Sequence, residues 1–259
     1  MKKLAHFCGI MLAATSFMFQ SCDDSDGYSI GDIAVDWATV EAKDSHTYSL
    51  TGDTWGTLWP AASAFPWSPE DGERVVIVFN PLYDDFQGYD CAIKIEGIRS
   101  ILTKDVEELT EENDAELGND PIYIEKRNMW IGGGYMNIVF TQNLPAQEKH
   151  RISLVHTTPL ALDSEGYLTL ELRYNTYDDM TGLYGNGAVS FNLNPIEALP
   201  GMKGVKIKLN SAINGEVTVP FELMDEPTPN EVKQMDFSKM EIELLGFKER
   251  VCDRVSRAK

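Results

Sequence analysis

Hydrophobic and polar residues alternate with a period of two along most of the chain from Tyr28 onward. The clearest alternation covers residues 168–175, and the runs 205–209 and 217–221 also place their apolar residues on one face. This period is typical of β-strands with one buried face. Residues 75–79 form a continuous β-branched and aromatic run, which predicts a strand covered on both faces. Further strands are expected near residues 30–40, 46–51, 93–95, 121–127, 134–141, 151–157, 187–193 and 240–245.

Turn residues separate these runs, and few segments have the period of a helix. Asn214 and Gly215 stand between two of the strands and predict a tight hairpin whose turn needs a positive φ. The segment 103–120 breaks the strand pattern, because the stretch from Asp105 to Asp120 contains eight acidic residues and no basic one. Like charges at this density resist compaction, so we expect a solvated linker over 103–120, with a calcium site as the alternative use of the acids.

Such a linker would divide the chain into two β-rich parts. The first part, 28–102, has about five short strands, which suits a small OB-like β-barrel. The second part, 121–245, has seven or eight strands, which suits a two-sheet β-sandwich. A mixed-charge tail, 246–259, follows the second part. The predicted fold class is therefore all-β, with an OB-like barrel followed by a β-sandwich.

The first residues have the pattern of a secretory leader rather than of a folded element. Two lysines precede an interrupted apolar run that is shorter than the roughly 20 residues of a membrane span. The run ends in Phe-Gln-Ser-Cys at 19–22, which resembles a bacterial lipobox. We expect residues 1–21 to be cleaved as a lipoprotein signal peptide, Cys22 to carry the lipid anchor and 22–27 to form an acidic tether. An ordinary cleaved leader, with an incidental cysteine, is the alternative.

Composition and charge narrow the class of protein. The 259 residues are 43% hydrophobic and 24% charged, as in ordinary globular proteins, so a wholly disordered or fibrous chain is excluded. The net charge is −19, and loss of the two leader lysines makes that of the mature chain −21. A surface of this sign repels phosphate, so nucleic acid and anionic membrane surfaces are not expected as partners.

The cysteines and histidines lack the spacing of a metal or redox site, so neither a metal nor a cofactor is expected. Cys91 alternates with two isoleucines and should face a core. A disulfide between Cys91 and Cys252 is left open, because an envelope compartment permits it. His150 and His156 are expected to be hydrogen-bonded structural residues rather than bases or metal ligands.

Motifs of catalysis are missing from the sequence. The chain carries no nucleophile elbow, zinc-protease motif or phosphate-binding loop, so no catalytic residue is expected. Asp84, Asp85 and Asp90 flank a glycine in a predicted turn, and a carboxylate pair there is the basis of a hydrolase alternative. Aspartates that hydrogen-bond their own turn are far commoner. The glycines 132–134 stand in a strand context and predict a bulge or a close approach of the backbone.

Aromatic residues are the most suggestive candidates for a binding surface. Trp55, Trp59 and Trp67 fall within 13 residues that also contain prolines. Prolines preorganise loops, and exposed indole faces can stack on sugar rings or anchor a protein partner. The favoured interpretation is that these rings close the end of the barrel and pack on the next domain, since large aromatic side chains usually lie mostly buried. A binding surface is the alternative.

A family resemblance is carried by stretches that follow one another along the chain, among them GDTWGTLWP (52–60), RVVIVFNPLYDD (74–85), WIGGGYMNIVF (130–140), GYLTLELRYN (166–175) and KGVKIKLNSAINGE (203–216). Through them the chain resembles the NigD-like lipoprotein family of Bacteroidota. The resemblance implies an N-terminal OB domain, a C-terminal β-sandwich and an outer-membrane lipoprotein. In that group, acids after the lipidated cysteine look like a surface-export signal, so Asp23, Asp24 and Asp26 would direct Cys22 to the outer leaflet. The family name implies a bacteriocin-immunity role, and no catalytic residues carry over.

The expected function is that of a non-enzymatic, surface-exposed outer-membrane lipoprotein that acts as an interaction module, in the manner of a bacteriocin-immunity protein. The expected partner is an extracellular protein or peptide such as a bacteriocin, and the negative charge would steer a cationic toxin to the surface. A glycan-binding surface lipoprotein that uses the three tryptophans is the first alternative. An envelope hydrolase that uses the aspartates of 84–90 is the second.

Overall fold

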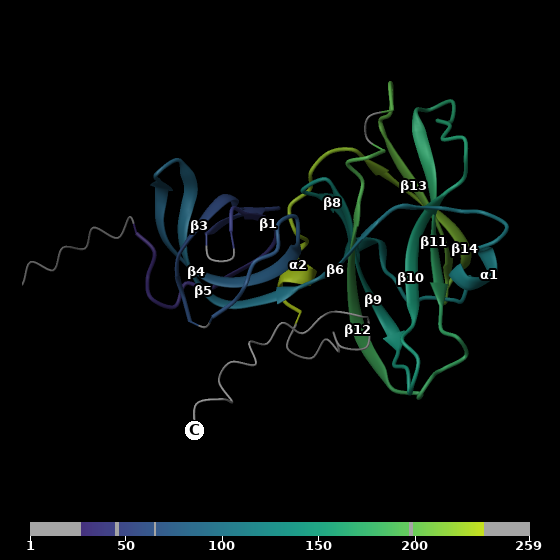
Figure 1. The fold of residues 1–259 in the computed structure, drawn as a ribbon, viewed down its shortest axis with the longest axis horizontal. Helices are drawn as coiled ribbons and strands as arrows, with labels where there is room; N and C mark the ends of the chain where they lie inside the picture. The colour runs from purple at the N-terminus through teal and green to yellow at the C-terminus, as the bar shows by residue number, and fades with distance from the viewer. Residues whose placement is uncertain (1–26, 45–46, 65, 197–198, 236–259) are drawn as a thin grey trace, which may run out of the picture.

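The computed structural model describes residues 27–44, 47–64, 66–196 and 199–235. They form two β-domains that lie side by side, with the short helix α2 (Asn230–Lys233) between them (Figure 1). The expected signal peptide, the lipidation site Cys22, the strand expected at 240–245 and the mixed-charge tail lie outside the described residues. The all-β fold class, a barrel followed by a sandwich, is confirmed.

The N-terminal domain is a closed five-stranded barrel with the order β1-β2-β3-β5-β4. Neighbouring strands are antiparallel except for β3 and β5, which pair in parallel. Alternating side chains such as Val40, Leu50 and Ile93 point inward and are fully buried. The strands are β1 (Ala34–Ala42), β2 (Tyr48–Gly52), β3 (Gly56–Ser63), β4 (Arg74–Phe86) and β5 (Tyr89–Ser100).

The C-terminal domain is a sandwich of two sheets. One sheet has the order β14-β13-β11-β10-β7 and the other the order β6-β12-β9-β8. A single cluster of buried apolar residues fills the space between the sheets and includes Leu154, Leu170, Phe191 and Ile207. The strands not yet bounded are β8 (Met129–Gly132), β9 (Tyr135–Asn143), β10 (Arg151–His156), β11 (Tyr167–Asn175), β12 (Tyr184–Asn192), β13 (Gly204–Ser211) and β14 (Gly215–Glu222).

The acidic segment 103–120 belongs to the sandwich, which corrects the predicted solvated linker. Its strand β6 (Leu102–Asp105) pairs in parallel with β12, and β7 (Glu107–Glu108) pairs in parallel with β10. The short helix α1 (Asp114–Leu117) follows. Arg151 forms ion pairs with Glu107 and Glu116, and Arg173 forms one with Asp114, so cations from β10 and β11 offset the repulsion among the acids.

The strand predictions differ from the structure mainly at three places. Strands β3 and β8 were not predicted, because β3 contains a proline and β8 is buried along its whole length and shows no alternation. The strand expected at 121–127 is reduced to isolated bridges at Ile122 and Tyr123. The hairpin at Asn214 and Gly215 is confirmed, since β13 and β14 pair across it and Gly215 has a φ of +69°.

Within the described residues, we find no helix with the length and apolar character needed to cross a membrane.

Candidate functional site

The three tryptophans of the predicted binding surface lie on the barrel, and each packs against a different ring. Trp55 meets Phe79 edge-on with ring centroids 5.4 Å apart, and Trp67 meets Tyr48 in the same way at 5.2 Å. Both indoles are half-buried and pack against the apolar core of the barrel. Packing of Trp55 and Trp67 against the barrel core agrees with the burial that the favoured interpretation expects, but neither ring joins the apolar cluster of the sandwich, so the expected packing on the next domain is not observed for the described residues.

Trp59 is also half-buried and lies tilted against Tyr89, with centroids 5.2 Å apart. A sugar-binding platform needs coplanar, exposed faces. Among the described residues, no ring contact joins any two of the three tryptophans. Their geometry gives the glycan alternative no support.

Two of the three aspartates near the β4–β5 turn accept hydrogen bonds from other parts of the chain. Asp84 accepts a hydrogen bond of 2.8 Å from the Tyr28 hydroxyl, an interaction that raises the pKa of Tyr28 to about 12. Asp90 accepts hydrogen bonds of 2.7 Å from both the amide and the hydroxyl of Thr57, which lower the pKa of Asp90. Asp85 lies at the end of β4, next to the turn, and has a φ of +52°. The lowered pKa of Asp90 is the opposite of what a general acid needs. Asp84 and Asp90 bind Tyr28 and Thr57, which are distant in the sequence, and do not bond their own turn as expected.

The histidines and Cys91 occupy structural positions. His150 is buried, with Nδ1 2.6 Å from the Tyr174 hydroxyl and Nε2 2.7 Å from the Asp179 carbonyl oxygen, as expected for a hydrogen-bonded structural residue. His156 is half-buried beside the Thr157 carbonyl oxygen. Cys91 faces the barrel core as predicted, whereas Cys252 lies outside the described residues. The described part of the chain holds no group of three His, Cys, Asp or Glu side chains that could bind a metal.

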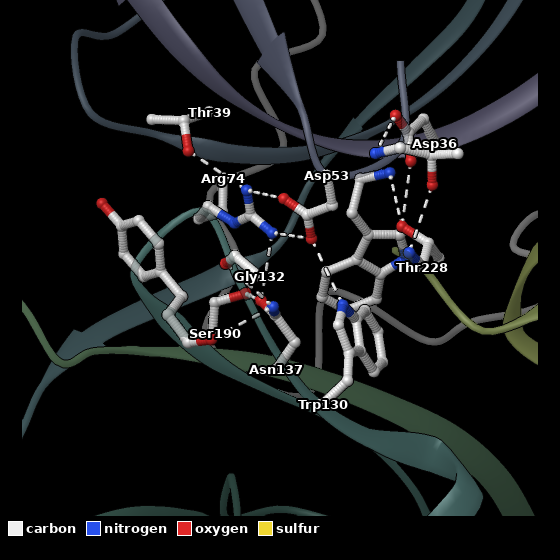
Figure 2. Close-up of polar contacts among 12 residues, drawn as sticks. Asp36, Thr39, Asp53, Arg74, Trp130, Gly132, Asn137, Ser190 and Thr228 are labelled. Atoms are coloured by element: carbon white, nitrogen blue, oxygen red, sulfur yellow. Dashed lines mark hydrogen bonds and ion pairs between the residues drawn. The ribbon is translucent and has the colours of Figure 1, made fainter. Parts of the chain in front are cut away.

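A buried polar network joins the two domains (Figure 2). The Arg74 guanidinium on β4 donates to both carboxylate oxygens of Asp53 at 2.9 and 2.7 Å, and both side chains are fully buried. It also donates to Thr39 in the barrel at 3.1 Å and to Asn137 in the sandwich at 3.2 Å. The Trp130 indole, also from the sandwich, donates to Asp53 at 3.2 Å. Groups from both domains therefore hydrogen-bond to the ion pair, while Nε of Arg74 is buried with no partner among the described residues.

A second buried carboxylate, that of Asp36, extends this network. It accepts hydrogen bonds from the amides of Thr54 and Trp55 at 2.9 and 3.0 Å and from the Thr228 hydroxyl at 2.9 Å. Burial outweighs these donors and raises the pKa of Asp36. Nearby, the rings of Trp37 and Trp130 meet edge-on at 4.7 Å. We call the set Asp36, Asp53, Arg74, Trp130, Asn137 and Thr228 the interdomain joint.

The sequence analysis did not predict the interdomain joint, although two charged residues in apolar stretches could have indicated it. Asp36 stands among apolar residues in β1, and Arg74 directly precedes a long apolar run. Each is a charge in an otherwise buried strand, which requires a partner. The predicted close approach at the glycines is confirmed, because a Cβ on Gly132 would lie 2.6 Å from Oδ2 of Asp53 and one on Gly133 would lie 3.0 Å from the Arg74 guanidinium.

A groove on the sandwich is the second feature that the sequence did not reveal. Its volume is about 470 Å³, and strands β9 and β12, the 3-10 helix η1 (Lys126–Asn128), the β13–β14 turn and α2 surround it. The rings of Tyr123 and Tyr184 meet edge-on across 6.4 Å at its rim. We call this site the sandwich groove and define it by Tyr123, Arg127, Asn128, Tyr184, Ile213 and Glu231.

Comparison with protein families identifies the chain. Residues 37–101 match the NigD-like N-terminal OB domain, and residues 105–223 match the NigD-like C-terminal β-sandwich domain. The barrel and the sandwich of the structure coincide with these two matches. The chain belongs to the NigD-like family.

Solved structures show the same fold. A protein of unknown function from Bacteroides vulgatus is 26% identical, with a TM-score of 0.69 over 81% of this chain and 100% of that chain. A protein described as toxin-related from Parabacteroides distasonis is 32% identical, with a TM-score of 0.62 over 79% of this chain and 100% of the other. A NigD-like immunity protein from Bacteroides caccae, 17% identical, shares the fold with a TM-score of 0.56 over 74% of this chain and 94% of its own. No curated protein matches the chain.

Proposed function

We propose that this chain is a surface-exposed outer-membrane lipoprotein that binds an extracellular protein or peptide, as a bacteriocin-immunity protein would. Cys22 carries the acyl chains, residues 22–27 form the tether, and the two domains act as one rigid, non-enzymatic interaction module. The lipobox-like sequence at 19–22 supports the anchor. The likeness in fold to a protein called a NigD-like immunity protein supports the class of role.

The orientation of the anchored protein is inferred from where the described chain enters the barrel. Strand β4 runs from Arg74 in the interdomain joint to Phe86 at the β4–β5 turn, and Tyr28 hydrogen-bonds Asp84 near that turn. In Figure 1 the described chain enters the barrel on the side away from the sandwich. A lipid on Cys22, six residues before Tyr28, would hold the barrel near the membrane and direct the sandwich outward.

The anchor is tested by Cys22→Ser in the native host. We expect the wild-type protein in the outer-membrane fraction and labelled by a palmitate analogue, and the variant unlabelled and released, because loss of the thiol removes the site of acylation. Protease added to intact cells should digest the wild-type sandwich if it faces outward.

The matched control for the anchor is Cys252→Ser, which removes a thiol and leaves the lipobox intact. This control should remain labelled and membrane-bound. A Cys22→Ser protein that stays in the membrane fraction, or a wild-type protein without label, would refute the anchor.

A further inference from the structure

We propose that the sandwich groove is the binding site of the module and that it takes an extended peptide with basic and apolar side chains. This inference rests on the proposed function, because it names the site and the chemistry of the partner. One side of the groove borders the joint, since Asn128 and Glu231 stand two and three residues from Trp130 and Thr228 of the joint. Its other side lies farther away, because Tyr184 begins β12 and Ser190, six residues or about 20 Å further along the strand, bonds Asn137 of the joint.

Apolar exposure marks the groove as a contact surface. Tyr123, Tyr184 and Ile213 expose 45%, 60% and 65% of their surface. All three line the same concave site. Clustered, exposed large apolar side chains that border a concavity mark binding sites, whereas the same residues scattered singly would not. Tyrosine contributes large contact area with little loss of side-chain entropy, so the Tyr123–Tyr184 pair can present one continuous aromatic surface to an apolar side chain.

The charge of the groove selects a basic partner. Glu125 and Arg127 neutralise each other at 2.7 Å, whereas Glu231 on α2 forms no ion pair with any described residue. The charged side chains that line the groove therefore sum to a negative charge, of the same sign as the −19 of the whole chain, while Lys126 and Lys233 lie on η1 and α2 outside this lining. A cationic side chain can pair with Glu231, and the field of the protein steers a cationic peptide toward the groove.

The polar atoms of the groove suit a peptide backbone. Oδ1 of Asn128 is buried in its wall without a hydrogen-bond donor, and a rotation of the amide would present this acceptor to a bound N–H group. Thr141 and Asn186 add further polar groups, linked by a hydrogen bond of 3.4 Å. A neutral glycan could also use these groups and the tyrosines, but it would gain nothing from Glu231. The unpaired carboxylate thus favours the peptide.

Calorimetric titration of the purified full mature chain tests the site. The probe is a decapeptide that alternates lysine and leucine, compared with one that alternates glutamate and leucine and with the neutral glycan maltoheptaose. We expect binding of the lysine peptide only. Tyr184→Ala should weaken it about tenfold, as for a central interface aromatic, and Glu231→Gln about threefold, as for a partly exposed ion pair.

Two matched controls separate the groove from general attraction to an acidic protein. Glu112→Gln removes the same charge at an exposed acid before α1, and Tyr83→Ala removes a tyrosine of similar exposure, 65%, on the barrel. Both should bind as the wild type does. Equal weakening by Glu112→Gln and Glu231→Gln, full affinity in Tyr184→Ala, no binding of the lysine peptide, or binding of maltoheptaose that is lost in Tyr184→Ala would each overturn the assignment. The result of the Cys22→Ser test would stand in all these cases.

Discussion

Two aspartates of the barrel show that burial and hydrogen-bond donors shift the pKa of a carboxyl group in opposite directions. Burial raises the pKa of Asp36 although three donors face its carboxylate. The amide and hydroxyl of Thr57 lower the pKa of the exposed Asp90. A pKa difference between the folded and unfolded chain makes the free energy of unfolding depend on pH. The contributions of the two residues to this free energy should therefore change with pH in opposite directions.

We expect Asp36→Asn and Asp90→Asn to reveal these slopes. The folded pKa of Asp36 lies above the unfolded value of about 4, so the folded state holds this proton more tightly and its contribution to stability falls as pH rises above about 4. The stability difference between wild type and Asp36→Asn should therefore decrease with rising pH in that window. For Asp90, whose folded pKa is lowered, the difference should be present above about 4 and be lost as pH falls below it.

Urea unfolding over a pH series measures both differences, with each variant serving as the control for the other. If both stability differences changed with pH in the same direction, the opposite pKa shifts assigned to Asp36 and Asp90 would be wrong. At this scale the sequence predicted what a residue's own strand determines, such as the inward face of Cys91. It could not predict the partners of Asp36, because Thr228 lies 192 residues away and reaches it only through the fold.

The acidic segment 103–120 shows the same limit for whole elements. Its charge density indicates a solvated linker, yet it supplies β6, β7 and α1. Burial opposes ionisation of Glu107, but hydrogen bonds from Lys104 and Ser153 and the charges of Lys104 and Arg151 outweigh it and lower the pKa of Glu107. One of these cations, Arg151, comes from β10, 44 residues later in the chain than Glu107, so the charge of the segment alone misleads.

Arg151→Ala tests whether the ion pairs of Arg151 hold the acidic segment 103–120 against the sandwich. The change leaves Glu107 and Glu116 without their shared cation, so we expect a loss of about 1–2 kcal/mol in the free energy of unfolding. Hydrogen exchange of the amides in 107–117 should also become faster. Arg127→Ala is the control, because its ion pair with Glu125 is well exposed and should contribute less than about 1 kcal/mol. Unchanged exchange in Arg151→Ala would show that backbone pairing alone suffices.

The interdomain joint makes the two domains one body. The apolar cluster of the sandwich also includes Trp37 and Val76 from the barrel, so the two cores meet without a solvent layer. Each domain could be predicted from its own alternation and size. Their relative placement could not, because it depends on Arg74 meeting Asn137 and on Trp130 meeting Asp53, contacts between residues 63 and 77 positions apart.

Arg74→Met tests this coupling. It leaves the Asp53 carboxylate buried and unpaired, so we expect a loss of about 3–5 kcal/mol, and the barrel should unfold at lower urea than the sandwich. The wild type should unfold in one transition, with tryptophan fluorescence and circular dichroism coincident. Lys94→Met, which breaks a partly exposed ion pair with Glu96, should cost less than about 1 kcal/mol and keep one transition.

The double variant Arg74→Met with Asp53→Leu distinguishes loss of the pair from an isolated buried charge. Replacing both partners by apolar side chains removes the unpaired carboxylate, so the double variant should be more stable than Arg74→Met alone. If the two are equally unstable, the coupling comes from hydrogen bonds to Asn137 and Trp130 rather than from charge. If Arg74→Met keeps a single wild-type transition, the apolar contact around Trp37 is sufficient to hold the domains together, and the rigid module would no longer depend on the joint.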